Sequence, residues 1–551
     1  MKALLLWPRF PPTFWSFEGV LSLVGRKALL PPLGLATVAA LLPEEWEFRL
    51  IDRNVSEVSD EDFDWADIVL LSGMIVQRDD CTYLIEEAGR RGKPVVVGGP
   101  YATSVPQDFI DAGADYLVVD EGEITIPIFL EHIAQHGLSK RAKGAGPVIF
   151  SAGERKPEVS TSPVPRFDLF DFSAYDGMCV QFSRGCPFLC EFCDIITLYG
   201  RKPRTKGPAQ FLEELDRLFE LGWRGSIFLV DDNFIGNKRN VKQLLGELLA
   251  WQKAHGFPFW FDTEASIDLA ADTHLMDLMV RCHFASVFIG IETPDQDSLA
   301  LTRKHQNNRS PLEDSVRTIT RKGLRIMCGL IVGFDGEAKG AGSRIVEFIE
   351  RTAIPTPLLS MLQALPNTAL WTRLEREGRL LGSIANLNQT TTLNFVPTRP
   401  ARDIIEEHAQ AFWALYDPRA YTMRVYRCLL ELGAERPAPD VAIVSCKRPA
   451  GWSRLQALRD AFVVARAFGI VVLRQGIMRE SRFTFWLCFM GILIKRPDNF
   501  ERFITLCAHN EHFLVYRIKV RASAEKILSE LPPRVELDTR AIEAPEEITF
   551  V

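Results

Sequence analysis

The sequence predicts an α/β protein with two parallel-sheet domains followed by a mainly helical region. Short runs rich in Val, Ile and Leu alternate with helix-length segments over residues 1–145, and the same alternation returns over residues 178–397. Over residues 398–551 the apolar residues recur at helical spacing. The chain has 551 residues, of which 47% are hydrophobic and 25% charged, and it is long enough for about three globular domains.

Residues 1–145 have the pattern of a doubly wound, Rossmann-like domain. Strands are predicted at residues 3–7, 48–52, 68–72, 94–98 and 116–119, with helices at 32–42 and 79–91 among the segments between them. The strands show little polar alternation, as parallel strands buried on both faces do. Such sheets bind ligands at their C-terminal strand ends. The residues there are Gly73, Met74, Gly98, Gly99, Pro100, Glu121, Gly122 and Glu123. The glycines either let a large flat ligand approach the backbone or make tight turns.

A proline-containing linker, residues 146–177, leads to a second domain over residues 178–397. Six strands separated by helical segments are predicted there, at residues 180–183, 226–230, 259–263, 286–291, 326–332 and 358–364. Repeated strand–helix units predict a parallel barrel, and six units predict a partial (β/α)6 barrel. We expect its chemistry at the C-terminal strand ends.

Polar residues follow several of these barrel strands. They are Asp232 and Asn233, Glu264 and Ser266, Glu292, and the glycine turn at Gly333. Because an unpartnered buried carboxylate costs several kcal/mol, their repetition at one edge favours a ligand site over chance. Asp231 has a simpler interpretation, as a cap of the helix that follows.

Cys186, Cys190 and Cys193 form a CxxxCxxC pattern. Three thiolates this close can bind one iron–sulfur cluster but are one short of the usual four, which leaves one iron open to another ligand. The alternatives are a zinc site or three unrelated buried cysteines. Structural zinc sites usually pair two short cysteine motifs, and the sequence has no second one.

The triplet, with an aromatic residue directly before its last cysteine, resembles the radical S-adenosylmethionine (SAM) superfamily. The resemblance implies a [4Fe-4S] cluster whose open iron chelates SAM. It also implies that Phe192 packs against the adenine, that Asp232 and Asn233 lie near the SAM amino group, and that Glu264 and Ser266 face its ribose or carboxylate. Glu292 and Gly333 complete the expected site. Arg204, in the basic run 201–206, either neutralises the SAM carboxylate or belongs to a solvated surface.

The first domain resembles the cobalamin-binding domain that precedes many radical SAM domains. The residues that carry this resemblance are Gly98-Gly99-Pro100 and Glu121-Gly122-Glu123. The DxHxxG motif that supplies a cobalt ligand elsewhere is missing, and the first histidine is His132. The resemblance therefore implies cobalamin bound base-off without a His ligand, with Gly73 and Met74 under the corrin. The aromatic segment 9–27 is expected to cover part of the site.

Helices are predicted in the third region at residues 402–416, 420–432, 452–478 and 482–494. The region is either ordinary helical packing or a lid that keeps water from a radical intermediate. A further alternative is that the helix at 479–493 rests on a membrane surface. The whole layout resembles cobalamin-dependent radical SAM enzymes with an extra helical domain, a group that includes hopanoid C-2 methylases.

This resemblance implies methylation of an unactivated carbon in a small molecule, either a lipid or a polycyclic compound, with an external electron donor such as flavodoxin or ferredoxin. A rearrangement or cyclisation without methyl transfer and a non-enzymatic cobalamin sensor stay open as alternatives. A methylthiotransferase is disfavoured, because those enzymes hold a second cluster on N-terminal cysteines and only Cys81 precedes Cys179 here.

Bulk composition narrows the partners and the location. The net charge of −7 argues against nucleic acid as the main partner. The longest uncharged apolar run, residues 483–494, is too short to span a bilayer. The N-terminal apolar run is too short for a signal peptide, and the eleven cysteines are irregularly spaced. We therefore expect a cytoplasmic protein with free thiols, with contact at a membrane surface as the alternative location.

Overall fold

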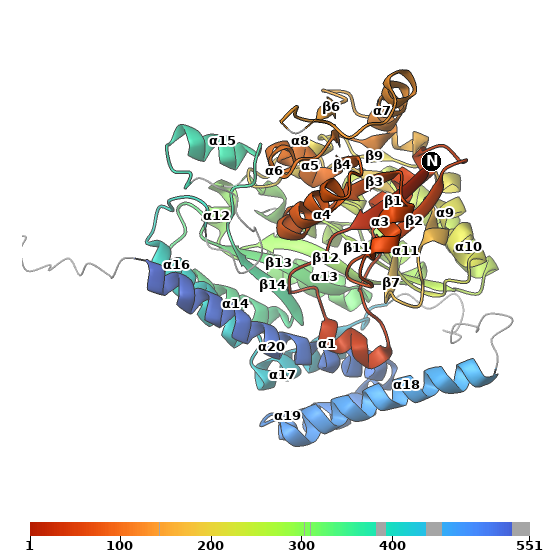
Figure 1. Ribbon diagram of the computed structural model, residues 1–551. Helices are drawn as coiled ribbons and strands as arrows, with labels where there is room; N and C mark the ends of the chain where they lie inside the picture. Colours follow the sequence, from red (N-terminus) through yellow and green to blue (C-terminus); the bar gives the residue numbers. More distant parts are fainter. Residues whose placement is uncertain (143, 302, 309, 382–392, 437–453, 532–551) are drawn as a thin grey trace, which may run out of the picture.

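The structure is a computed structural model that describes residues 1–551 except 143, 302, 309, 382–392, 437–453 and 532–551 (Figure 1). It begins with a six-stranded parallel sheet of order β2-β1-β3-β4-β5-β6. The strands are β1 (Lys2–Trp7), β2 (Glu47–Asp52), β3 (Ile68–Ser72), β4 (Val95–Gly98), β5 (Tyr116–Val118) and β6 (Val148–Phe150). The five predicted strands are confirmed. The sixth, β6, lies in the segment predicted as a linker.

Helices cover both faces of this sheet, which confirms the doubly wound arrangement. One face packs against α3 (Asp60–Trp65), α4 (Arg78–Arg90), α5 (Pro100–Ser104) and α6 (Pro106–Ala112). The other face packs against α2 (Leu33–Leu41) and α7 (Gly122–His136). Strands between two helical layers have no solvent-facing side, which explains their continuous apolar sequence.

The second sheet is also six-stranded and parallel, with the order β14-β13-β12-β11-β10-β7. Its strands are β7 (Gly177–Val180), β10 (Gly225–Leu229), β11 (Phe259–Glu264), β12 (Phe284–Glu292), β13 (Arg325–Val332) and β14 (Thr356–Met361). The helices between them are α9 (Pro208–Glu220), α10 (Lys238–Ala254), α11 (Thr273–Arg281), α12 (Gln296–Leu301), α13 (Leu312–Lys322) and α14 (Ala341–Thr352). The two end strands β7 and β14 do not pair, so the partial barrel is confirmed.

The first barrel strand lies three residues earlier than predicted. Residues 183–184, expected at its end, instead form β8 (Ser183–Arg184), which pairs antiparallel with β9 (Arg204–Thr205). This small ribbon encloses the cysteine segment and the short helix α8 (Ile195–Leu198). The cysteines therefore lie in a loop held at both ends.

The third region is helical, as predicted. It contains α16 (Ala401–Leu415), α17 (Pro418–Glu431), α18 (Arg454–Leu473), α19 (Arg482–Lys495) and α20 (Phe500–Glu530), preceded by α15 (Ala369–Arg376). The 31-residue α20 was not among the predicted helices. Figure 1 shows α18 and α19 on the side of the molecule away from the N-terminal sheet. None of the described helices is long and apolar enough to cross a membrane.

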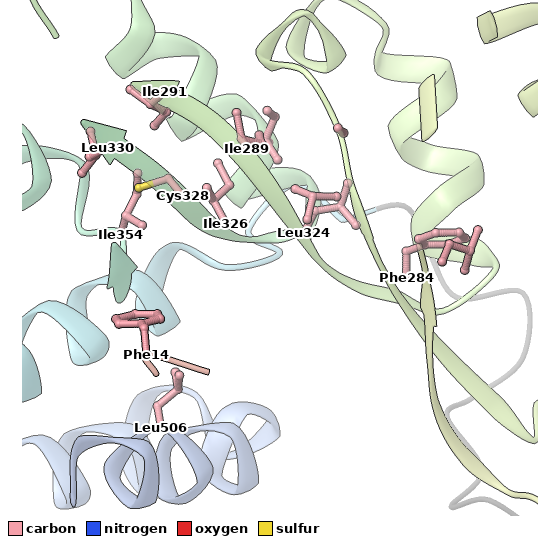
Figure 2. Close-up of a cluster of buried hydrophobic side chains, with 14 of the residues drawn as sticks. Phe14, Phe284, Ile289, Ile291, Leu324, Ile326, Cys328, Leu330, Ile354 and Leu506 are labelled. Carbon is pink, nitrogen blue, oxygen red and sulfur yellow. The ribbon is translucent and has the colours of Figure 1, made fainter. Parts of the chain in front are cut away.

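One hydrophobic core joins the barrel, the helical region and the N-terminal segment. Phe14 is fully buried there, and its ring stacks on Phe513 of α20 with centroids 4.8 Å apart. Figure 2 shows Phe14 between the barrel strands and Leu506 of α20. The helix α1 (Glu18–Leu21) continues this contact along α20. The N-terminal segment thus bridges the barrel and the helical region.

Candidate active site

The cysteine loop begins at Gly185, which only glycine can occupy without distortion. Its φ is +91°, and an added Cβ would lie 2.8 Å from the carbonyl oxygen of Gly200. The Gly185 amide donates to Asp232 Oδ2 at 2.9 Å, and the Cys186 amide donates to the Gly200 carbonyl at 3.3 Å. These contacts fix the loop against the ends of β8 and β10.

The three thiols differ from every other described cysteine in exposure. Cys186, Cys190 and Cys193 are half-buried, whereas the other seven described cysteines are buried. Burial raises the pKa of the Cys186 thiol, and likewise that of the Cys193 thiol. The loop thus presents its thiols to a partly open space, while the rest serve as small apolar core groups.

Amide donors face two of these thiols. Asn233 Nδ2 lies 4.0 Å from Cys186 Sγ, and Gln306 Nε2 lies 3.7 Å from Cys190 Sγ. The described residues contain no group of three His, Cys, Asp or Glu side chains placed around a single metal ion. Three thiols on one loop with amide N–H groups beside them are a donor set that fits an iron–sulfur cluster, whose sulfurs accept such hydrogen bonds.

Three carboxylates gather at the ends of β10 and β11. Burial raises the pKa of Asp231 to about 7, that of Asp232 to about 6 and that of Glu264 to about 8. The negative charges of Asp231 and Asp232 add to the effect at Glu264. Part of Glu264 stays accessible, and no described side chain hydrogen-bonds its carboxylate. This cluster favours a cationic ligand group.

Asp231 does not cap the following helix. Its carboxylate accepts from the Phe182 amide at 2.8 Å and from Ser183 Oγ at 2.5 Å. It therefore fastens the end of β10 to the entry of the cysteine loop, which is a structural role.

Asn233 and Ser266 are brought together as expected of one site. Asn233 Nδ2 donates to Ser266 Oγ at 3.2 Å, and the Ser266 amide donates to Asn233 Oδ1 at 3.3 Å. Ser266 Oγ also donates to Asp268 Oδ1 at 2.5 Å. Through Asn233, the end of β11 is connected to the thiol of Cys186.

Glu292 lies at an irregularity of β12 and has a φ of +65°. Its carboxylate forms a buried ion pair with Lys304. Lys304 Nζ lies 5.8 Å from the centroid of the Phe192 ring. Burial alone would lower the pKa of Lys304, but the charge of Glu292 raises it. The Glu292–Lys304 pair therefore places an ammonium group beside the cysteine loop.

The segment that carries Lys304 was missed in the sequence. Gln306 contacts Cys190, and Asn307 Nδ2 donates to the Ile291 carbonyl at 2.9 Å while its buried Oδ1 has no partner. The only local signal is a run of polar residues after α12. Nothing in the spacing shows that this run returns to the end of β12.

Gly333 directly follows β13 and has a φ of +99°, and its amide donates to Glu337 Oε2 at 2.8 Å. An added Cβ would lie 3.1 Å from Leu393. The next residue, Phe334, faces Phe192 with ring centroids 5.9 Å apart. The turn at Gly333 therefore places an aromatic ring next to the residue that precedes Cys193.

Arg204 and two of the predicted cobalamin residues meet in an ion network between the domains. Arg204 Nη2 donates to Glu121 Oε1 at 2.8 Å and to the Tyr199 carbonyl at 3.0 Å. Arg184 Nη1 donates to Glu121 Oε2 and to Glu123 Oε2, both at 2.9 Å. All four side chains are buried or nearly so. Their donors and acceptors are engaged within the protein, and Gly122 between the two glutamates starts α7.

A cavity of about 980 Å³ lies between the N-terminal domain and the barrel. Met74 and Pro100 line it from the strand ends of the first domain, Cys179 and Phe228 from the barrel, and Asp194 from the cysteine loop. Phe10 and Trp15 of the N-terminal segment complete one wall, where cover was expected. Its size is at the upper end of ordinary ligand pockets, and the lining is mainly apolar.

The predicted glycines let the backbone come close to other groups near this cavity. A Cβ added at Gly73 would lie 2.7 Å from Cys81 Sγ. One added at Gly98 would lie 2.9 Å from the Val118 carbonyl oxygen, and one added at Gly99 would lie 2.5 Å from Ser72 Oγ. Gly99 also has a φ of +95°. No histidine is among the described residues that line the cavity. A mainly apolar cavity of about 980 Å³ beside the loop that carries Met74 fits a large flat ligand such as a corrin.

Comparisons with protein families match three consecutive parts of the chain. A B12 binding domain matches residues 22–130, the Radical SAM superfamily matches residues 180–349, and a domain of unknown function (DUF4070) matches residues 368–526. The order of the first two matches is that of the two parallel-sheet domains.

Two curated relatives match almost the whole chain. An uncharacterized methyltransferase of Synechocystis sp. is 58% identical, with 98% of this chain and 96% of that protein covered. Hopanoid C-2 methylase of Rhodopseudomonas palustris is 33% identical, with 94% and 93% covered.

Two solved structures share the fold at low identity. The radical SAM methyltransferase TsrM from Kitasatospora setae, with cobalamin and a [4Fe-4S] cluster bound, gives a TM-score of 0.58 at 15% identity, covering 85% of this chain and 99% of that one. The cobalamin-dependent SAM radical enzyme OxsB, with aqua-cobalamin and SAM bound, gives 0.55 at 16% identity, covering 97% and 82%.

Proposed function

The chain belongs to the cobalamin-dependent radical SAM family, and we propose that it transfers a methyl group to an unactivated carbon of an apolar small molecule. The observation that carries the proposal is the shared cavity. Met74 and Pro100 of the first domain and Asp194, which directly follows Cys193, line the same space. Both cofactor regions therefore border one reaction chamber, as a reaction between them requires.

When bound, the [4Fe-4S] cluster and SAM supply the radical that removes a hydrogen atom from substrate, and cobalamin supplies the methyl group. In this proposal Cys186, Cys190 and Cys193 hold the cluster. Asn233 and Gln306 donate hydrogen bonds towards two of its sulfur ligands. An external donor such as flavodoxin or ferredoxin delivers the reducing electron.

We assign the carboxylate of Asp232 to the SAM amino group, as the resemblance implies, and we place Glu264 at the same amino group and not at the ribose or carboxylate, where the resemblance put it. Glu264 has no described hydrogen-bond partner and a raised pKa, so its ionised form is disfavoured until a cationic ligand binds and stabilises it. Phe192, which lies near both Lys304 and Phe334, offers an aromatic face for the adenine. The hydrogen bond between Asn233 and Ser266 fixes the edge of the site that would face the SAM ribose.

Cobalamin is assigned to the part of the cavity below the first sheet's strand ends. Gly73, Gly98 and Gly99 let the backbone close tightly behind the loop that carries Met74 and Pro100. Met74 is 52% exposed and, with Ile75 and Val76, lines the cavity, so it supplies a soft apolar surface there. Trp7 and Phe228 add apolar surface to the walls of this cavity, which suits an apolar substrate.

The test compares three strains grown with methyl-labelled methionine, the cellular precursor of SAM. One lacks the gene, one carries the wild-type chain and one carries Cys193→Ala. The proposal predicts at least one labelled apolar metabolite that only the wild-type strain makes. An unlabelled new product would identify a rearrangement or cyclisation instead. No difference between the strains, together with no SAM cleavage by reconstituted protein, would support a sensor.

A further inference from the structure

The helix α19 has large apolar side chains on both of its faces. Its inner face, which includes Phe485, Phe489 and Ile492, is buried. Its outer stripe is between 38% and 75% exposed. The outer stripe consists of Phe483, Trp486, Leu487, Met490, Leu493 and Ile494. A surface helix normally turns polar residues outward, so this stripe requires an apolar neighbour.

The exposed apolar surface continues beyond α19. Ile477 and Met478, in the π-helix Arg474–Met478 that continues α18, are 59% and 69% exposed, and Leu473 at the end of α18 is 48% exposed. Figure 1 shows α18 and α19 together at the edge of the molecule, away from both sheets. The outer stripe and these three residues form what we call the α19 face.

Positive charges frame the α19 face. Residues 454–496 contain eight Arg or Lys and two Asp or Glu, although the whole chain has a net charge of −7. Arg479 and Arg482 flank one end of the outer stripe, and Lys495 and Arg496 flank the other. Arg479 pairs with Glu511 and Arg496 pairs with Asp498, so Arg482 and Lys495 are the two of these four that supply charge for an outside partner. The Arg482 guanidinium lies 4.9 Å from the Phe483 ring centroid, where apolar and charged groups are presented side by side.

We propose that the α19 face docks on the surface of an anionic lipid membrane, with α19 parallel to the membrane plane. The apolar stripe would enter the boundary of the acyl chains, and the basic ends would contact the headgroups. The arrangement does not suit a second copy of the chain. In a two-fold dimer formed through this face, each basic end of α19 would lie against a basic end of the other copy. Like charges would then repel each other across the interface.

A second cavity lies beside the α19 face, since Met478 is part of its lining. Its volume is about 460 Å³, and its lining includes Met478 of the α19 face and Arg474, Arg479 and Lys519. It shares Ser16 and Glu18 with the cavity between the domains. Glu18 and Glu511 lie in the same lining as the three basic residues, so the described lining of this cavity offers no apolar path to the reaction chamber. The docking proposal does not depend on it.

The experiment measures co-sedimentation of the full-length holoprotein with vesicles. One set contains phosphatidylglycerol and phosphatidylcholine in about equal amounts, and the other contains phosphatidylcholine alone. We expect stronger binding to the anionic set, and weaker binding when salt is raised from about 0.05 to about 0.5 M. The double variant Leu487→Glu/Ile494→Glu should bind vesicles at least about tenfold more weakly, because two apolar side chains that would enter the membrane become charged.

The matched control is Leu381→Glu, since Leu381 is 62% exposed and Leu487 is 66% exposed. It should bind within about twofold of wild type, in line with the near-neutral effect of a surface substitution outside the contact. A second variant, Arg482→Glu/Lys495→Glu, keeps the stripe and removes its charged frame. It should lose the preference for anionic vesicles, which keeps the test decisive if the first variant unfolds.

Three results would overturn the proposal. They are no vesicle binding by the wild-type chain, undiminished binding by a folded Leu487→Glu/Ile494→Glu variant, and a wild-type dimer in solution that the same variant dissociates. The last result would assign the face to a contact between copies. Vesicle binding is measured without substrate or turnover, so a failure of the proposed methyl transfer would leave this result standing.

Discussion

Glu121 Oε2 lies 2.9 Å from Arg184 Nη1, and this ion pair connects the N-terminal domain to the start of the cysteine loop. Arg184 comes two residues before Cys186, and Glu121 comes directly before α7. Arg204 reaches the other oxygen of the same carboxylate. One buried network of ion pairs therefore connects the first domain to the segment that carries the thiols. Changes in either domain that disturb this network should also change the cavity between them.

Glu123 in this network predicts a specific pH dependence. Burial alone would raise its pKa, but hydrogen bonds and charge from Arg184 and a hydrogen bond from Ser162 lower the pKa of Glu123 to about 2. Because the folded-state pKa is depressed, the stabilisation is present above the unfolded value near 4.5 and is lost as the pH falls towards 2. Glu123→Gln should lower the unfolding free energy by about 3 kcal/mol at pH 7.

Denaturant unfolding of the wild-type chain and of Glu123→Gln at pH 7, 5, 4 and 3 measures the difference in their unfolding free energies. The control is Glu57→Gln, which removes an exposed ion pair with Arg9 and should cost less than about 1 kcal/mol. A Glu123→Gln difference that stays constant down to pH 3 would show that the carboxylate contributes packing and not charge.

Gly99→Ala should distort the loop that holds Pro100 in the cavity. Alanine would meet Ser72 Oγ at 2.5 Å and take a φ of +95°, which costs about 1–3 kcal/mol for the backbone alone. Thermal unfolding and the cobalamin retained after gel filtration measure the effect. The double variant Ser72→Ala/Gly99→Ala should recover the part of the lost stability that is due to the clash with Ser72 Oγ. The control is Gly92→Ala, because nothing lies within 4 Å of a Cβ added at Gly92. Equal losses at Gly92 and Gly99 would contradict this account.

Glu264→Gln should stabilise the cofactor-free chain and weaken SAM binding. The pKa of Glu264 is raised to about 8, mainly by burial, so the folded state binds this proton more tightly than the unfolded chain. Stability is therefore lost as the pH rises from about 4.5 to about 8, and the variant should be more stable by several kcal/mol at pH 8 and by little at pH 4.5. Calorimetric SAM binding supplies the second measurement. A variant that is less stable at pH 8 would reveal a structural role for the carboxylate.

The sequence predicted most of the fold because parallel strands leave a local signature. Nearly all predicted strand bounds agree with the structure within about two residues, and the cysteine loop follows from three residues in one short segment. The strand β6 was not predicted because it is a three-residue edge strand with one exposed side chain, Ile149. The 31-residue α20 escaped because its polar and apolar residues follow no single stripe where it crosses α16, α17 and the N-terminal segment.

The site was less predictable where it depends on long-range pairing. Glu121 and Arg184 are 63 residues apart, and Arg204 is 83 residues from Glu121. No local spacing distinguishes their ion network from a surface run or a strand-end ligand. Lys304 and Gln306 were missed for the same reason, because α12 and the bulge at Glu292 bring them back to the thiols.

The division of labour between the two cofactor regions is the central claim, and one measurement tests it directly. Iron, cobalamin and 5′-deoxyadenosine formation are determined together for reconstituted wild-type protein and for Cys186→Ala/Cys190→Ala/Cys193→Ala. We predict that the variant loses cluster iron and SAM cleavage but keeps cobalamin at the wild-type level, because the cavity walls at Met74 and Pro100 do not include these thiols. Retained cluster iron, or loss of cobalamin together with the iron in a folded variant, would contradict the account.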